Sequence, residues 1–377
     1  MTEHINNKKY TYFVTGGGTG GHIYPAVAVG FALQKEPDTD KVFYVGNPNN
    51  LEKKIAEDKV FDFLGVNISA MPKTLSFDFV KWNFQLLFAT IKAISYIFKY
   101  KPSLIFGTGG YVSAPMLFAG VLTGTPIVLH ECDAIPGKVS KLLAPYAKFV
   151  SIAFESAKEQ LKSNNIKFNG NPIREEFSST DRYHARQIWK LKDRLTIMVM
   201  GGSQGAKKLN SVIVQNLKKL FKKYDIQIIH QTGLKNYDDT VKELKKVYPN
   251  YTENSQYIIR PYFKKMYLPM LASDIAVSRA GSLSISEICA SGLASILVPY
   301  PYAAADHQRK NAKEMEELNA ALYLDDTDCT AEALMEKLEE LINNTQKMIE
   351  LQNNAKKLVR KDATKDIVGQ IKEVLNK

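Results

Sequence analysis

Cysteine, long apolar runs and an apolar leader segment are what this sequence has least of. Its three cysteines, Cys132, Cys289 and Cys329, are far apart and lack the Cys/His spacing of a zinc site. We therefore expect free thiols in a reducing compartment and no bound metal. No segment reaches the roughly 20 uninterrupted apolar residues of a spanning helix, because Lys92 interrupts the best candidate, residues 84–98. The polar start MTEHINNKKY predicts no secretion signal.

Glycine, in contrast, is concentrated at two points, each directly after an apolar run. TGGGTGGHIYP (Thr15–Pro25) follows residues 10–14, and GGSQGA (Gly201–Ala206) follows residues 195–200. Because glycine has no Cβ, such a turn lets backbone N–H groups and the next helix N-terminus approach a phosphate. A tight strand-to-helix connection that binds nothing is the alternative, and neither turn reads GxGxxG. The glycine content and the histidine of the first turn favour anion binding, and the two turns predict two nucleotide-binding halves.

The size and charge of the chain limit what it binds. With 377 residues and 45% hydrophobic content, the chain is long enough for two domains. Its net charge of +11 favours an anionic partner such as a phosphorylated substrate or a membrane surface. The basic residues are dispersed, however, as on an ordinary solvated surface. We find no aromatic-plus-basic RNA motif and expect no nucleic-acid partner.

Alternating strand and helix patterns predict an α/β fold with two doubly wound parallel sheets. The pattern restarts after Asn171-Pro172, which places a first domain at residues 1–171 and a second at 172–359. The final helical stretch, residues 360–377, is expected to cross back onto the first domain. The expected strands are residues 10–14, 42–45, 104–106, 127–129 and 149–152 in the first half, and 195–200, 227–231, 257–260, 275–278 and 295–298 in the second.

In the second half, polar residues follow two of the expected strands. SRAGSLSISE starts a helix with hydroxyl groups at Ser282 and Ser284, where N–H groups and the helix dipole favour a diphosphate. Glu287 in the same helix could accept hydrogen bonds from a ribose, or it could only complement the helix dipole. Gln308 and Asn311 offer donors and acceptors suited to sugar hydroxyls, although an ordinary polar helix start has the same residues.

Arg174 stands at the domain junction, where a guanidinium can pair with phosphate oxygens or remain a solvated surface group. In the first half, His22 begins the helix after the glycine turn. A lone histidine is usually structural, but at a strand end it can act as a general base near neutral pH. Two more loops, GTGGYVS with Gly109 and Gly110 and HECD with Glu131, also follow expected strands. Open α/β sheets bind ligands at such strand ends.

The helix expected at residues 79–99 has more apolar surface than one core contact needs. A stripe of Phe84, Leu87, Phe88, Ile91, Ile94 and Phe98 is expected to face a core, and Trp82, Leu86, Ala93 and Ile97 lie outside it. Lysines at positions 81, 92 and 99 share one side, and those at positions 73, 138, 141 and 148 are candidate neighbours. This pattern favours docking on an anionic membrane surface, and burial on two sides is the alternative.

Seven motifs in order resemble those of the peptidoglycan glycosyltransferases of glycosyltransferase family 28. They span residues 10–312 and read GGGTGGHIYPA, GTGGYVSAP, HECDAIPG, GNPIR, GGSQGAKKLN, SRAGSLSISE and PYPYAAADHQRKNA. The resemblance implies the GT-B architecture, in which two Rossmann-like domains face a deep cleft. It implies UDP-N-acetylglucosamine (UDP-GlcNAc) as donor and undecaprenyl-pyrophosphoryl-N-acetylmuramoyl-pentapeptide (lipid I) as acceptor. The product is lipid II for peptidoglycan synthesis, formed by inverting transfer without a cofactor or metal.

The resemblance also assigns residues. His22 is expected to be the catalytic base, with Glu131 as the second choice. The acceptor side comprises Thr19, Gly20, Gly21, Gly109 and Gly110, and the donor side comprises Arg174, Ser203, Phe263, Ser282, Leu283, Ser284, Glu287, Gln308 and Asn311. Asp133 stands where the family usually has asparagine, in a loop expected to touch the donor sugar, and it cannot donate as an amide does.

The resemblance further implies a peripheral protein on the cytoplasmic side of the cell membrane, with an anionic membrane surface and other cell-wall synthesis proteins as partners. Two rival enzyme classes share this plan, namely another GT-B lipid glycosyltransferase and a UDP-GlcNAc 2-epimerase. A non-catalytic nucleotide binder would explain the net charge, but it would not require the His22 turn.

Overall fold

The computed structural model describes residues 9–58, 61–72, 77–202 and 205–376. The chain divides into two compact units. Unit 1 consists of Met1–Arg174 and Asp362–Lys377, and unit 2 consists of Glu175–Lys361. The division after Arg174 lies three residues beyond the boundary expected from the sequence, so Arg174 belongs to unit 1.

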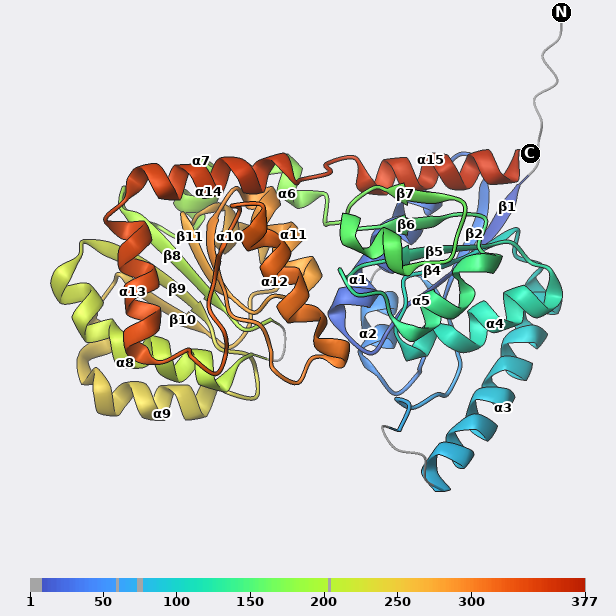
Figure 1. Cartoon of the computed structure of the whole chain (residues 1–377), viewed down its shortest axis with the longest axis horizontal. Helices are drawn as coiled ribbons and strands as arrows, with labels where there is room; N and C mark the ends of the chain where they lie inside the picture. Colours follow the sequence, from blue (N-terminus) through green and yellow to red (C-terminus); the bar gives the residue numbers. More distant parts are fainter. Residues whose placement is uncertain (1–8, 59–60, 73–76, 203–204, 377) are drawn as a thin grey trace, which may run out of the picture. The chain divides into compact units, whose positions relative to one another are not determined.

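Unit 1 is built on a parallel sheet that has seven strands within the described residues (Figure 1). The strand order is β3-β2-β1-β4-β5-β6-β7. Successive residues of β1 point to opposite faces, so that Phe13 joins one core cluster and Tyr12 and Val14 join the other. The strands are β1 (Tyr10–Thr15), β2 (Thr39–Gly46), β3 (Asp62–Gly65), β4 (Leu104–Gly107), β5 (Ile127–Glu131), β6 (Val150–Ile152) and β7 (Ile166–Phe168).

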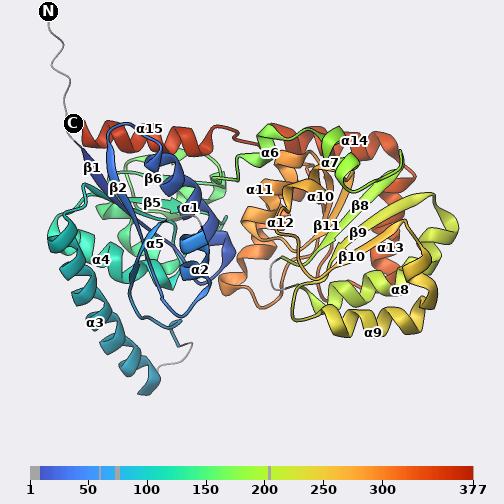
Figure 2. The same ribbon diagram turned by 180° about the vertical axis from the view of Figure 1, so that it is seen from behind.

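Helices cover both faces of this sheet, as parallel sheets require. One face packs against α3 (Phe77–Tyr100) and contacts α4 (Ala114–Thr123) and α5 (Lys138–Leu143). The other face packs against α1 (Gly20–Gln34) and α15 (Ala363–Leu375), with α2 (Leu51–Asp58) nearby. The return of the last helix to unit 1 is therefore confirmed (Figure 2). Ile367 and Ile371 of α15 are fully buried there, and Lys372 binds the carboxylate of Glu36 at 2.6 Å.

Unit 2 repeats the architecture around a parallel sheet that has six strands in the described part of the chain, in the order β10-β9-β8-β11-β12-β13. The strands are β8 (Leu195–Met200), β9 (Ile226–Gln231), β10 (Tyr257–Arg260), β11 (Ile275–Ser278), β12 (Ala294–Leu297) and β13 (Leu322–Tyr323). The helices are α6 (Glu176–Ser179), α7 (Arg182–Ile188), α8 (Lys207–Lys223), α9 (Tyr237–Val247), α10 (Tyr267–Leu271), α11 (Ser282–Ser291), α12 (His307–Glu317), α13 (Ala331–Ile342) and α14 (Thr345–Lys357). The predicted fold class is confirmed, because both sheets are parallel and doubly wound.

The orientation of α3 differs from the expectation. Ala89, Ala93 and Ile97 face the core, and the stripe that was assigned to the core is largely exposed. Phe84, Phe88 and Phe98 keep 58%, 67% and 70% of their surface exposed. Small alanines four residues apart let the helix approach the sheet and α4 closely, and the large side chains then point away. Burial of this helix on two sides is thus excluded.

Candidate active site

The glycine turn of unit 1 lies where the order of strands in the sheet reverses. The chain runs from β1 to β2 and β3 on one side and then returns to β4 on the other. Thr15, the last residue of β1, pairs with Gly107, the last residue of β4. The turns that follow these two strands therefore begin side by side at the carboxyl edge of the sheet. This edge, beside the reversal of strand order, is where open α/β sheets bind ligands.

His22 is held between these two turns. The hydroxyl of Thr108 donates to the backbone carbonyl oxygen of His22 at 2.6 Å. This contact holds the backbone of His22 and does not involve its imidazole ring. A Cβ placed on Gly109 would lie 3.7 Å from His22 Nδ1, and one on Gly110 would lie 3.1 Å from His22 Cδ2. The ring therefore rests on the glycine backbone of the second turn. The structure brings His22, Gly109 and Gly110 together with Thr19, the residue that precedes α1.

Glu131 ends β5 at the same edge and organises the loop that follows. Its side chain is 3% exposed, and its two oxygens accept from the backbone N–H groups of Asp133 (3.2 Å) and Gly137 (3.0 Å). Burial, and secondarily the nearby charge of Asp133, raise the pKa of the Glu131 carboxyl to about 7. The carboxylate is thus committed to loop contacts, although a pKa near 7 suits proton transfer.

His130, the neighbour of Glu131, is structural. Its ring is fully buried, with Nδ1 3.0 Å from the Ser151 hydroxyl and Nε2 2.9 Å from the Asn171 side-chain oxygen. Burial lowers the pKa of His130 to about 4. This neutral imidazole ties β5 to β6 and to the end of unit 1 near Arg174, whose guanidinium lies 5.8 Å from the centre of the Tyr24 ring of α1.

The glycine turn of unit 2 has the same relation to its sheet. Met200 at the end of β8 pairs with Ser278 at the end of β11, so the turn after β8 begins beside the start of α11. Gly202 and Gly205 have φ angles of 76° and 77°, which favour glycine. A Cβ on Gly205 would lie 2.0 Å from the carbonyl oxygen of Thr232, so only glycine fits this position. Ser203, an expected donor contact in this turn, lies outside the described residues.

Gln231 is a residue that the sequence reasoning missed. Its side-chain oxygen accepts from the backbone N–H of Phe263 at 2.9 Å, and its amide nitrogen lies 3.4 Å from the carbonyl oxygen of Gly202. It therefore links the glycine turn to the loop of Phe263, whose ring packs edge-on against Trp189 with centres 5.2 Å apart. The only sequence signal for this role was the position of Gln231 at a strand end.

The starts of α11 and α12 come together. A Cβ on Gly281 would lie 3.9 Å from the Ser284 hydroxyl and 4.0 Å from the Gln308 amide nitrogen. The Gln308 side-chain oxygen accepts from the backbone N–H of Tyr300 at 3.0 Å, which leaves its amide group directed toward the helix start. No acidic residue occupies the first turn of α11, so its N–H groups and dipole remain suited to an anion.

The other expected donor-side residues are more enclosed. Ser282 and Glu287 are buried in α11, with 3% and 6% of their surface exposed, and Leu283 is half-buried. Asn311 is fully buried and donates to the carbonyl oxygen of Ala280 at 3.2 Å. This contact gives Asn311 a role in fixing the turn before α11. Its expected contact with a sugar hydroxyl remains a prediction.

Arg279 is a second residue whose role the sequence did not reveal. Its guanidinium donates to the carbonyl oxygens of Val298 (3.2 Å) and Pro299 (3.0 Å) and to the carboxylate of Asp326 (2.5 Å). Arg279 is buried and the Asp326 side chain is only 13% exposed, so Arg279 joins the ends of β11 and β12 largely shielded from water. The RAG sequence gave no indication of this partner because Asp326 is distant in the chain.

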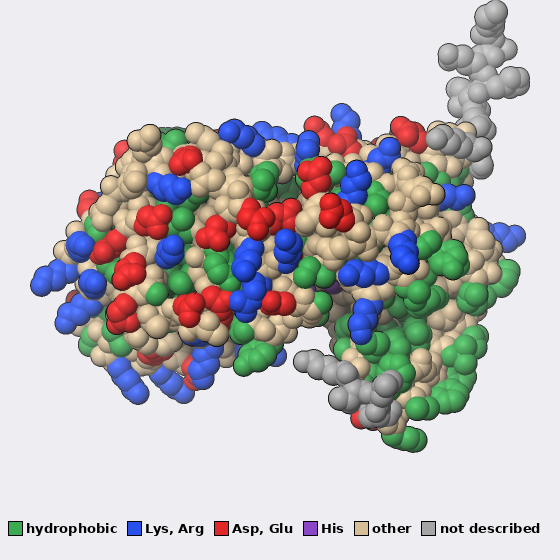
Figure 3. Space-filling model, in the orientation of Figure 1, with side chains coloured by type: hydrophobic (Ala, Val, Ile, Leu, Met, Phe, Trp, Pro, Cys, Tyr) green, Lys and Arg blue, Asp and Glu red, His purple; other side chains and the backbone are tan. Residues whose placement is uncertain are grey.

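The exposed apolar residues of α3 form a continuous feature of unit 1. Hydrophobic side chains gather over this helix in the space-filling view (Figure 3). We call them the α3 patch, defined as Phe77, Val80, Phe84, Leu87, Phe88, Ile91 and Phe98. Lys81, Lys92 and Lys99 are exposed on the same helix. Among the helices that the structure describes, none combines the length and apolar character needed to cross a membrane.

Two parallel-sheet units, each with a glycine turn at the reversal of its strand order, define the class of two-domain enzymes with the GT-B architecture. Comparison of the sequence with models of known protein families identifies one family within this class. Residues 12–152 match the glycosyltransferase family 28 N-terminal domain, and residues 196–368 match the glycosyltransferase family 28 C-terminal domain. The chain belongs to glycosyltransferase family 28.

Relatives with an assigned activity align with nearly the whole chain. A UDP-N-acetylglucosamine–N-acetylmuramyl-(pentapeptide) pyrophosphoryl-undecaprenol N-acetylglucosamine transferase of Desulforamulus reducens is 35% identical over 96% of this chain and 98% of its own length. The protein with the same name from Bacillus subtilis is 34% identical with the same two coverages. The crystal structure of Acinetobacter baumannii MurG is similar, with a TM-score of 0.75 and 28% identity over 97% of this chain and 99% of that one.

Other solved structures share only the fold. A putative UDP-N-acetylglucosamine 2-epimerase from Listeria monocytogenes has a TM-score of 0.72 at 14% identity, covering 98% of this chain and 97% of that one. Likeness at this level of identity carries no information on activity.

Proposed function

We propose that this protein transfers N-acetylglucosamine from UDP-GlcNAc to the muramyl sugar of undecaprenyl-pyrophosphoryl-N-acetylmuramoyl-pentapeptide. The observation that carries this function is the identity of about one third, over 96% of the chain, to relatives that are named for this reaction. The 2-epimerase alternative is not favoured, because the structural likeness to epimerases comes with only 14% identity. A different lipid acceptor is likewise not favoured by the names of these relatives.

The acceptor belongs, in this proposal, at the carboxyl edge of unit 1. Thr19, Gly20 and Gly21 present the N-terminus of α1 to the acceptor diphosphate, where unpaired N–H groups and the helix dipole favour negative charge. Gly109 and Gly110 have no side chains, so in this proposal the acceptor sugar can approach the backbone closely at these two positions. The contact of His22 with this same turn supports its role as the base.

The donor belongs at the carboxyl edge of unit 2. Ser282, Leu283 and Ser284 at the start of α11 hold the diphosphate and sugar, and Gln308 with Asn311 serves the sugar hydroxyls. Glu287 accepts from the ribose, and Phe263 supplies backbone groups to the uracil. The remaining donor-side residues of this proposal are Arg174 and Ser203 for the phosphates and Asp133 for the sugar.

The reaction is a single inverting displacement. The 4-hydroxyl of the muramyl sugar attacks C1 of the donor, its proton passes to His22, and the bond between C1 and the phosphate oxygen breaks as UDP leaves. Negative charge grows on the diphosphate during this step. The α11 N-terminus and the glycine turn after β8 are placed to stabilise that charge by preorganised N–H groups.

The assignment of the base is tested by His22→Ala, with the exposed His184→Ala as a matched control. Thr108 contacts the backbone of His22, so the substitution preserves this hydrogen bond. We expect kcat to fall by about 10²- to 10⁴-fold, the usual value of a general base, while the KM for UDP-GlcNAc stays unchanged. Transfer of labelled sugar to a short-chain acceptor measures both. A kcat within a few-fold of wild type would assign the base elsewhere, with Glu131→Gln as the next variant.

We also propose that the protein docks peripherally on the anionic cytoplasmic face of the membrane, through the α3 patch. Two features of α3 support this localisation, namely the large exposed phenylalanines and the exposed lysines on the same helix. A contiguous exposed apolar patch of this kind marks an interaction surface. Each lysine near an anionic leaflet contributes about 1 kcal/mol of attraction.

Vesicle sedimentation tests this localisation. We expect Phe84→Ser with Phe88→Ser to abolish binding to vesicles that contain anionic lipid, and Leu234→Ser, an equally exposed apolar residue of unit 2, to leave it intact. Wild-type binding should weaken as salt rises, because salt screens the lysines. Binding that ignores the phenylalanines, the lipid charge and the salt would contradict the proposal.

A further inference from the structure

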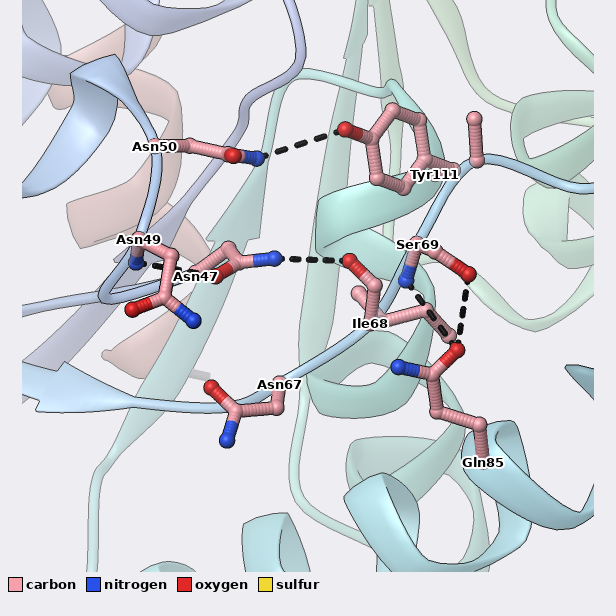
Figure 4. A pocket seen from close by; sticks show the side chains of 9 residues that line it. Asn47, Asn49, Asn50, Asn67, Ile68, Ser69, Gln85 and Tyr111 are labelled. Carbon is pink, nitrogen blue, oxygen red and sulfur yellow. Dashed lines mark hydrogen bonds between the residues drawn. The ribbon is translucent and has the colours of Figure 1, made fainter.

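A pocket of about 480 Å³ lies in unit 1, and none of the roles above uses it. Its most frequent lining group is a side-chain amide (Figure 4). The amides come from three separate elements, namely the loop after β2, the segment after β3, and α3. They belong to Asn47, Asn49, Asn50, Asn67 and Gln85, and the ring of Tyr111 closes one side.

Hydrogen bonds within the protein hold these walls in place. The Asn47 amide donates to the carbonyl oxygen of Ile68 at 2.7 Å, and the Ser69 hydroxyl donates to the side-chain oxygen of Gln85 at 2.8 Å. The Asn50 amide lies 3.3 Å from the Tyr111 hydroxyl. The pocket is therefore formed before any ligand arrives, which lowers the entropic cost of binding.

Other polar groups of the lining remain available. The side chains of Asn49 and Asn67 are exposed, and neither makes a hydrogen bond within the part of the chain that the structure describes (Figure 4). None of the described lining residues is a lysine, arginine, histidine, aspartate or glutamate. The described lining residues therefore offer neutral hydrogen-bonding groups, which suit a neutral polar ligand.

The pocket shares a wall with the proposed acceptor site. Tyr111 directly follows Gly110 in the second glycine turn, and a Cβ on Gly18 of the first turn would lie 2.9 Å from its ring. One side of the Tyr111 ring thus lies against the glycine turn, and its hydroxyl contacts the Asn50 amide of the pocket. A substituent attached to the acceptor sugar at the glycine turns would have this pocket beside it.

We infer that the pocket binds the peptide chain of the acceptor. This inference rests on the proposed function, because the substrate named for the relatives has a pentapeptide on its muramyl sugar. A primary amide offers a carbonyl acceptor and two N–H donors, the same groups that a peptide bond presents. Asn49 and Asn67 are the residues that pair with the peptide backbone, and the volume lies within the range of about 300–1,000 Å³ typical of ligand sites.

The test compares two acceptors, both with the same short prenyl chain and muramyl sugar. One has the pentapeptide, and the other ends in a simple amide at the lactyl group. The test variant is Asn49→Ala with Asn67→Ala in the full chain, and the matched control is Asn164→Ala, an exposed asparagine before β7 at the opposite edge of the sheet. Asn67→Ser alone is the second variant, since it retains a small polar side chain.

We expect the ratio of kcat/KM for the peptide-bearing acceptor to that for the peptide-free acceptor to fall about tenfold in the double variant. This is the effect of losing one or two net hydrogen bonds. The loss should appear as a higher acceptor KM, with the KM for UDP-GlcNAc unchanged. Asn164→Ala should retain the wild-type ratio, and Asn67→Ser should lie between the two.

An unchanged ratio in the double variant, or an equal loss on both acceptors, overturns the inference while the proposed function stands. A wild-type enzyme that uses the two acceptors equally well also overturns it. If the wild-type protein transfers sugar to neither acceptor, the proposed function itself is wrong and the inference falls with it.

Discussion

Replacing Gly110 by alanine adds one methyl group, and we expect it to lower the stability of unit 1 strongly. Gly110 has φ 75° and ψ 158°, a backbone region that essentially only glycine occupies. A Cβ at this position would lie 2.2 Å from the carbonyl oxygen of Gly17 and 3.1 Å from His22 Cδ2. The methyl group would therefore push the two glycine turns apart at the point where they hold the histidine.

The expected magnitude is the sum of two terms. The backbone conformation costs about 1–3 kcal/mol for a residue with a side chain, and the forced contact with backbone adds about 1–3 kcal/mol. Gly124→Ala is the matched control, because Gly124 also has a positive φ of 71° but no atom within 4 Å of its Cβ position. That variant should lose only about 1–2 kcal/mol, the cost of the left-handed backbone alone.

Hydrogen exchange of the full chain, read on backbone amides of β1 and β4, measures this difference within unit 1, and β8 of unit 2 serves as an internal reference. Since about 1.4 kcal/mol corresponds to a tenfold change, we expect exchange in β1 and β4 to accelerate about 30-fold or more for Gly110→Ala. Gly124→Ala should accelerate it by about tenfold. Glycosyl transfer should be lost only in the first variant. Equal effects of the two substitutions would refute the contact between the turns as the cause.

Three further outcomes follow from buried groups. Burial raises the pKa of Glu131 from 4.5 to about 7, so between these pH values the folded state keeps a proton that the unfolded state releases. The free energy of unfolding of the wild type, measured relative to Glu131→Gln, should therefore fall as pH rises from about 4.5 to about 7, by at most about 1.4 kcal/mol per pH unit. Because both proteins contain His130, the opposite pH dependence that His130 contributes cancels in this difference. Asp326→Ala leaves Arg279 buried without its carboxylate partner and should destabilise unit 2 by about 3–5 kcal/mol. The control Asp225→Ala removes a more exposed ion pair with Arg194 and should cost about 1 kcal/mol or less. Hydrogen exchange in β11 and β12 measures both losses, and equal losses would contradict the burial argument. The thiols of Cys132, Cys289 and Cys329 are buried, and burial raises their pKa values. A thiol reagent at pH 8 should therefore label them only after the protein unfolds. Fast labelling of any of the three in the folded protein would contradict their burial.

The sequence predicted those features that depend on local pattern. The glycine turns and the inner strands have turn chemistry or an apolar run that a short window of sequence contains. Strands β3, β7 and β13 were missed. They are edge strands of two to four residues, and strands of this length show little alternation. Their place is fixed by pairing with a neighbouring strand, which a local pattern does not report.

Contacts between distant segments could not be predicted in the same way. The partners of Arg279 and Gln231 depend on which strand ends lie next to one another. The orientation of α3 was predicted wrongly because the apolar stripe was assigned to the core by its size. Packing of Ala89 and Ala93 against the sheet decides the orientation, and hydrophobicity alone ranks such small residues below phenylalanine. The roles of individual site residues remain predictions for the experiments above.

The return of α15 to the first sheet sets an order of events during synthesis. Residues 175–361 are translated before α15, yet Ile367, Val368 and Ile371 fill the face of the sheet that begins with β1. Part of an apolar face of unit 1 therefore stays uncovered while unit 2 is synthesised, and unit 2 can already fold on the ribosome. Chaperones that bind nascent chains should consequently associate with the first 174 residues until the end of translation.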